Sequence, residues 1–143
     1  EIYDILTELE SLAAQRAAEA GYGEADLAQL ALSIAQMDQA VKDEDREAWA
    51  DADDLFHQEL VRLGGNKRIE AIVAVMSDQV RRARATTLFI RPLPVQSNED
   101  HRAVYQAISS GRAEEAHERH RQHRLQAKGV LIGILEKHRL NSL

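Results

Sequence analysis

The chain has 143 residues, a net charge of −6 and no cysteine. This length is enough for one domain with a buried core, and the missing thiols exclude disulfides and thiolate metal sites. The acidic balance argues against direct binding of a nucleic-acid backbone by this domain. No apolar run is long enough to span a membrane and no secretion signal is visible, so we expect a cytoplasmic protein without membrane contact.

Apolar residues at helical spacing recur along the chain, in segments 2–13, 27–41, 49–63, 69–80, 101–108 and 116–134. Turn-forming residues separate the segments, at positions 21–23, 42–45, 64–65, 91–96 and 110–111. Asn66 is expected to cap the fourth helix, and Ser97-x-x-Asp100 resembles a capping box at the start of the fifth. The pattern predicts a single all-α domain, an antiparallel bundle of about six helices.

Residues that commonly bind metals fall on the inward faces of three predicted helices. Asp53 and His57 are four apart, so they project from one helix face, and one ion can reach both. His101 and His123 lie on the apolar stripes of two later helices. Because a buried carboxylate without a partner is costly, these four residues predict a metal site made of nitrogen and oxygen ligands.

Each of these residues also has a simpler interpretation. Asp53 and His57 are compatible with a hydrogen bond between helix neighbours. A lone inward histidine is more often a hydrogen-bonded core residue than a ligand. On the last helix, His120 and His117 compete with His123 for the same ion; His123 lies nearest the centre of the stripe, and His120 is compatible with an effector contact or a core position.

The ligand set and its surroundings suggest the chemistry of the site. Three imidazoles and one carboxylate suit Zn, Ni, Co, Mn or Fe, and we expect Zn or Ni. With zinc, the same four ligands are also compatible with a closed structural site. On the fourth helix, Arg84 is placed to bind the carboxylate of a small effector, and Thr87 on the same stripe is placed to donate a hydrogen bond.

Several short motifs occur in one order along the chain: Asp53-Asp54-Leu55-Phe56-His57, Gly65-Asn66, His101-Arg102 and the spacing from Gly111 to His123. With the first helix, they make the chain resemble the FCD domain, the C-terminal effector domain of FadR-type regulators in the GntR family. The resemblance implies an all-helical bundle in which Asp53, His57, His101 and His123 hold a divalent ion.

That resemblance also implies partners. Open metal positions would take water or a small carboxylate effector, and an N-terminal winged helix-turn-helix domain, absent from this chain, would bind DNA as a homodimer. The chain starts at Glu1, with a helical pattern already running at Ile2, so we expect it to begin inside a longer protein. Departures from the family include Leu6 at a frequent arginine position and His120 at a commonly apolar one.

The predicted function is therefore ligand sensing by a transcription regulator rather than catalysis, with no catalytic residue assigned. A helical metalloenzyme using the same four ligands is the main alternative. Two features that would favour an enzyme are not found in the sequence. They are a general base besides the four ligands and a pair of Glu-x-x-His motifs of the di-iron type. A metal-free interaction module, in which the histidines serve only packing, is the third possibility.

Overall fold

The computed structural model describes residues 1–138, and within this range the chain forms helices and no strand. The helices are α1 (Ile2–Glu19), α2 (Ala28–Lys42), α3 (Arg46–Leu63), α4 (Lys67–Thr87), η1, a short 3-10 helix (Leu88–Ile90), α5 (Val95–Ser109) and α6 (Ala113–Lys137). The predicted all-α class and the count of about six helices are confirmed. None of the helices described is both long and apolar enough to cross a membrane.

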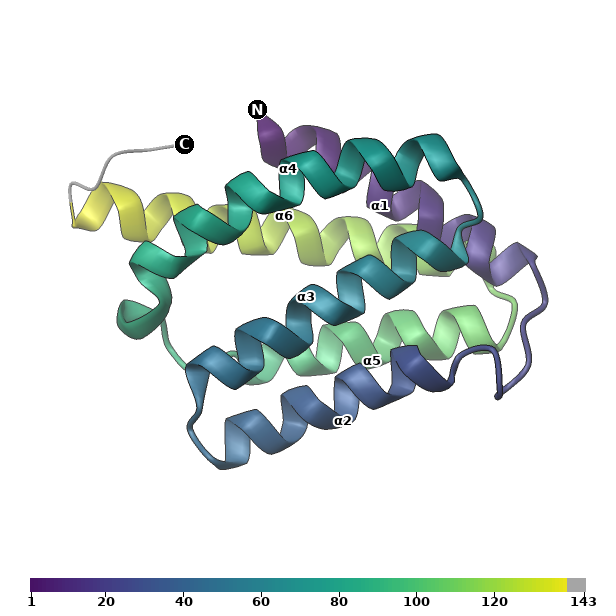
Figure 1. The fold of residues 1–143 in the computed structure, drawn as a ribbon, viewed down its shortest axis with the longest axis horizontal. Helices are drawn as coiled ribbons and strands as arrows, with labels where there is room; N and C mark the ends of the chain where they lie inside the picture. Colours follow the sequence, from purple (N-terminus) through teal and green to yellow (C-terminus); the bar gives the residue numbers. More distant parts are fainter. Residues whose placement is uncertain (139–143) are drawn as a thin grey trace.

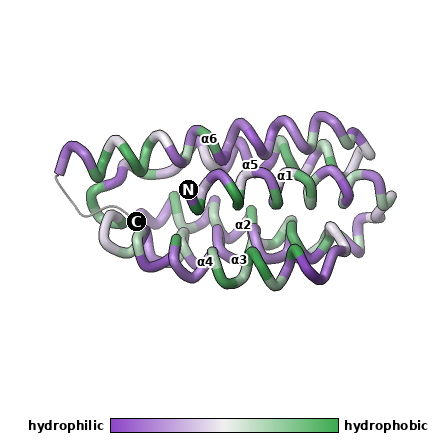
Figure 2. The backbone as a smooth tube through the Cα atoms, turned by 90° about the horizontal axis from the view of Figure 1, so that it is seen from above, coloured by the Kyte–Doolittle hydropathy of each residue, from purple (hydrophilic) through white to green (hydrophobic). Residues whose placement is uncertain are grey.

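The helices pack in two layers. Helices α1, α5 and α6 form one layer, and α2, α3 and α4 form the other (Figure 2). Within the layers, α6 packs against both α1 and α5, and α3 packs against both α2 and α4 (Figure 1). Helix α1 also contacts α3 and α4, which joins the layers and brings the inward faces of α1, α3 and α6 toward one another.

Local sequence signals account for most helix boundaries. The Asn66 side chain accepts hydrogen bonds from the backbone nitrogens of Arg68 and Ile69, so it caps α4 as predicted. Asp45 caps α3 in the same way through the nitrogen of Ala48. The turns at 21–23, 42–45, 64–65 and 110–111 also lie between helices as expected.

The start of α5 differs from the prediction. The helix begins at Val95, directly after Pro94, so Ser97 lies inside its first turn and is not a cap. Asn98 provides a reason for this position, because its side chain accepts from the Trp49 indole at 2.7 Å and is buried against α3. Tertiary contacts thus extend the helix past the local capping signal.

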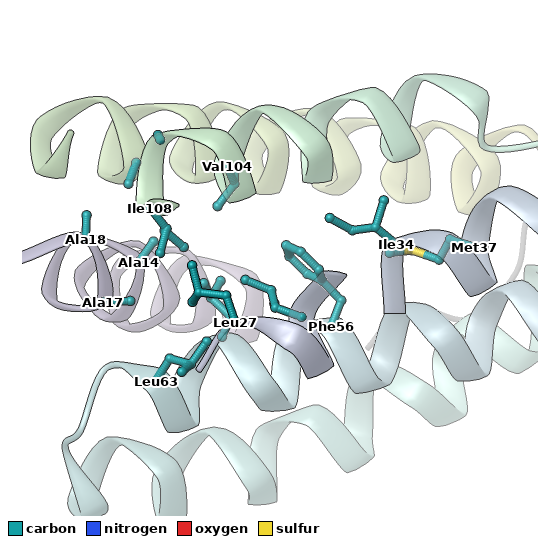
Figure 3. Close-up of a cluster of buried hydrophobic side chains, with 14 of the residues drawn as sticks. Ala14, Ala17, Ala18, Leu27, Ile34, Met37, Phe56, Leu63, Val104 and Ile108 are labelled. Atoms are coloured by element: carbon teal, nitrogen blue, oxygen red, sulfur yellow. The ribbon is translucent and has the colours of Figure 1, made fainter. Parts of the chain in front are cut away.

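The largest hydrophobic cluster lies between the layers (Figure 3). Its bulkiest fully buried members come from α2, α3, α5 and the residue before α2: Leu27, Leu30, Met37, Phe56, Leu60, Val104 and Ile108. Small residues of α1, such as Ala14 and Ala17, face the same cluster. The Phe56 ring packs edge-on against the His101 ring, with centroids 4.2 Å apart. The apolar core therefore borders directly on the predicted metal site.

Candidate metal centre

Three helices bring the four predicted ligands together. Asp53 and His57 stand one turn apart on α3, His101 lies on α5 and His123 lies on α6. The Oδ1 atom of Asp53 is 3.0 Å from Nε2 of His101 and 3.3 Å from Nε2 of His57. The three histidines offer nitrogen atoms that all lie within 4.8 Å of one another. These separations are short enough for a single ion to contact the three histidines, and Asp53 lies next to two of them.

The ligands are withdrawn from solvent. His101 is fully buried, Asp53 is 4% exposed and His123 is 7% exposed. His57 has a side chain that is 12% exposed. Water screens the charges of buried side chains only weakly, so electrostatic interactions between these four residues are strong.

Each histidine is oriented by an oxygen partner at its Nδ1 atom. The partners are Oε1 of Glu10 for His57 at 2.5 Å, the backbone carbonyl of Ser97 for His101 at 2.5 Å, and Oδ2 of Asp100 for His123 at 3.0 Å. Since each oxygen accepts, each Nδ1 carries the proton and donates it. The neutral tautomer then has its lone pair on Nε2. This is the arrangement in which metal-binding histidines are usually held.

Asp53 is oriented in a similar way. Its Oδ2 atom accepts from Arg84 at 2.5 Å, which leaves Oδ1 facing the histidines. Oδ1 of Asp53 and Nε2 of His101 are buried atoms that form no hydrogen bond of acceptable geometry within residues 1–138, although they lie 3.0 Å apart. Two lone pairs that meet in a dry site repel each other, and a cation between them removes the repulsion.

Burial and the close neighbouring charges shift the pKa values of these side chains. Burial alone would raise the pKa of Asp53, but the nearby charges of His57 and Arg84 outweigh it and hold that pKa well below 3.8. Burial would lower the pKa of His57, yet the carboxylates of Glu10 and Asp53 raise it to about 9. Burial and the neighbouring His123 lower the pKa of His101 to about 4. In the metal-free protein, therefore, a proton on Nε2 of His57 stands where a metal would bind.

Comparison with known proteins agrees with the all-helical fold. A family model described as "FCD domain" matches residues 1–126, most of the chain. The chain belongs to the FCD domain family. Among curated proteins, no relative matches the sequence. FCD domains are ligand-sensing domains of GntR-type regulators and not enzymes, so the family favours a regulator over a metalloenzyme.

Sequence reasoning missed Glu10, which the FCD domain buries next to the ligands. Glu10 is 1% exposed, and its Oε1 atom contacts both His57 and Nε2 of His120, the latter at 2.9 Å. Burial would raise the pKa of Glu10, but Arg124 and His57 outweigh it and keep the carboxylate ionised. A signal was present, because Glu10 follows Leu6 by one helical turn on the apolar face of α1.

The three residues predicted to contact an effector, Arg84, Thr87 and His120, have partners within the chain. Arg84 is 9% exposed and lies between Asp53 and Asp54, with one terminal nitrogen on each carboxylate. The Thr87 hydroxyl donates to the backbone carbonyl of Arg84 at 3.2 Å. Burial lowers the pKa of His120 to about 3, so its ring is neutral beside Glu10. Each of the three thus has a partner within the chain, and their contact with an effector stays a prediction.

A cavity of about 200 Å³ reaches the metal centre from the side of η1 and the start of α5. Three of the four ligands line it: Asp53, His57 and His123. Arg84 lines the same cavity, whereas His101 is not among the residues that line it. A small molecule in this cavity can therefore reach an ion held by the four side chains.

Proposed function

We propose that this FCD domain is the sensor of a bacterial transcription regulator and binds a divalent metal ion through Asp53, His57, His101 and His123. The observation that carries the proposal is the shared orientation of the three histidines. Each donates Nδ1–H to an oxygen outside the site and leaves Nε2 for the ion. A packing role alone gives no reason for rings on three helices to be oriented in the same manner.

The ion would remain open to a ligand. The cavity touches three of the four side chains that would hold it, so a water molecule or a small carboxylate can complete the coordination. Nitrogen and oxygen ligands of this kind suit Zn or Ni best, with Co, Mn and Fe as other choices. Arg84 holds the Asp53 carboxylate in place and also lines the cavity, where it adds positive charge near an acidic effector.

Ligand binding at this place couples helices that are far apart in the sequence. The proposed ligands come from α3, α5 and α6, and the cavity is also lined by Leu88 of η1 and Pro94 before α5. An effector that prefers one packing of these helices shifts the population toward it. In a cytoplasmic homodimer whose DNA-binding domains lie outside this chain, such a shift would change their spacing.

Elemental analysis of the purified protein by mass spectrometry tests the metal site without knowledge of the effector. We expect near-stoichiometric metal in the parent and a clear loss in His101→Ala and His123→Ala. His117→Ala is the matched control for His123→Ala, because His117 is only partly buried on the same helix and is not one of the three histidines whose nitrogens lie close together. A parent that takes up no Zn, Ni, Co, Mn or Fe after reconstitution would reject the metal-dependent mechanism.

A further inference from the structure

Arginine side chains line part of the cavity that leads to the candidate metal centre. Four of them line it: Arg46, Arg84, Arg91 and Arg124. Three aspartates also line it, but Asp53 is paired with Arg84, Asp100 accepts from His123, and Asp45 caps α3 at the exposed rim. The lining therefore has more positive charge than its own carboxylates neutralise.

The guanidinium of Arg124 is buried without adequate partners. The residue is 6% exposed, and its Nε and Nη2 atoms form no hydrogen bond within the described part of the chain. Its closest carboxylate oxygen, Oε2 of Glu10, is 3.9 Å from Nη1, at the limit of an ion pair. The guanidinium stacks instead on the Tyr3 ring, 4.9 Å from its centroid. Unpaired buried donors of this type carry a large desolvation cost.

Arg91 also lies near Tyr3. Its Nε atom donates to the Thr87 hydroxyl at 3.0 Å, while its buried Nη2 atom has no partner among residues 1–138. Burial and the repulsion from Arg84 lower the pKa of Arg91. The attraction to Tyr3 acts in the opposite direction but does not offset them. No carboxylate of the described residues forms an ion pair with this guanidinium. The cavity lining thus has two cationic side chains with open donors, Arg91 and Arg124, and both lie near Tyr3.

We infer that the cavity binds an anion with two acid groups, one at the metal and the second on Arg91 and Arg124. The inference rests on the proposed function for the first group and adds a second subsite to it. Guanidinium groups bind carboxylates and phosphates through paired hydrogen bonds, which would satisfy the open nitrogens. A volume of about 200 Å³ is below that of drug-sized pockets, so the ligand is a small metabolite-like diacid.

Matched pairs of small acids test the second subsite. Malonate, succinate, glutarate and adipate are compared with the monocarboxylate of the same chain length, by thermal shift and calorimetry on the metal-loaded protein. 3-Phosphonopropionate is compared with succinate, to distinguish a phosphate-type group from a carboxylate. We expect at least one diacid to bind about tenfold or more tightly than its monocarboxylate partner.

Variants assign that preference to the two arginines. In Arg91→Gln, Arg124→Gln and the double variant, the diacid should fall to the affinity of its monocarboxylate partner when the proteins are compared at equal metal occupancy. Metal occupancy is measured for each variant, because Arg124 also lies beside Glu10. Arg121→Gln is the control, because Arg121 is on the same helix, 40% exposed and 3.6 Å from Glu8. It should keep the preference.

Three results would overturn the inference: monoacids that bind as tightly as diacids, a diacid preference that survives in the double variant, or no binding by any diacid of the set. Failure of the proposed metal site is recognised separately, since it appears as absent metal in the parent. In that case diacid binding that depends on Arg91 and Arg124 would still support the arginine subsite by itself.

Discussion

At the scale of single residues, each histidine of the centre uses its two nitrogens differently. The Nδ1 atom donates to an outer oxygen, and Nε2 is left for the ion. For His57 the outer oxygen belongs to Glu10, a charged group that makes the imidazole a stronger ligand. The outer partners would therefore influence the affinity for the proposed ion without touching it.

Glu10→Gln should weaken metal binding about 10- to 100-fold, because the amide removes the negative charge behind His57 but keeps the side-chain shape. Competition with a chromophoric chelator measures this change. Glu8→Gln, an exposed neighbour on α1, should leave the affinity within error. Equal affinity in Glu10→Gln and the parent would mean that Glu10 serves packing alone.

Metal binding should release about one proton at neutral pH. The pKa of His57 is about 9 in the metal-free protein, so Nε2 must lose its proton before the ion can bind. His101, with a pKa of about 4, is already neutral. The apparent affinity should rise about tenfold per pH unit between pH 7 and pH 8. Calorimetry in buffers of different ionisation enthalpy counts the proton, and a count of zero contradicts the assignment.

The same shift affects metal-free stability. The folded pKa of His57 exceeds the ordinary value of 6.5, so its charged form stabilises the fold fully below pH 6.5. That contribution is lost as pH rises through about 9. Denaturant unfolding of the metal-free protein should show the decline between these limits, and Asp53→Asn should reduce it by removing one of the two carboxylates that cause the shift.

At the scale of helices, close approach of α1 and α3 places Glu10 beside His57. The approach depends on Gly64, which ends α3, because a Cβ atom there would lie 2.9 Å from both Cα and Cβ of Ala13. Gly64 has φ of −67°, so backbone conformation itself would accept alanine. The requirement for glycine is therefore one of space between two helices.

Gly64→Ala should cost about 1–3 kcal/mol of unfolding free energy, since α1 has to move away from the end of α3. Gly129→Ala is the matched control, because a Cβ at Gly129 meets no atom within 4 Å among the described residues. In the interior of α6 it should be neutral or stabilise by about 0.5–1 kcal/mol. Urea titrations compare the two, and equal stability would exclude the steric argument.

At the scale of the whole molecule, the proposed ion joins three helices from both layers. Its ligands lie on α3 in one layer and on α5 and α6 in the other. The apolar cluster around Phe56 lies next to them and fills the space between the layers (Figure 3). An ion that binds only the folded chain therefore stabilises the contact between the layers.

Saturating Zn or Ni should raise the melting temperature by an amount on the order of 10 °C, because binding at 1,000 times Kd contributes about 4 kcal/mol. A chelator should reverse the shift. Asp53→Asn should show little response, since the amide is a weaker ligand and cannot pair with Arg84 as a carboxylate does. An unchanged melting temperature with every metal tested would show that the fold does not depend on an ion.

The sequence by itself determined the helices and the composition of the predicted ligand set. Helix positions depend on local periodicity and on caps such as Asn66, and both are readable along the chain. Asp53 and His57 are readable for the same reason, because their spacing within one helix makes them neighbours. The fold class and the FCD family followed from these local patterns.

Only the tertiary structure decided which groups surround the ligands and the cavity. Glu10 and His120 are 110 positions apart, and their contact depends on how α1 packs on α6. Arg84 lies between two carboxylates of α3, while Arg91 and Arg124 keep open donors in the cavity lining. Periodicity tells which face of a helix is buried but not which face of another helix meets it, and the partners of these charged side chains depend on that second choice.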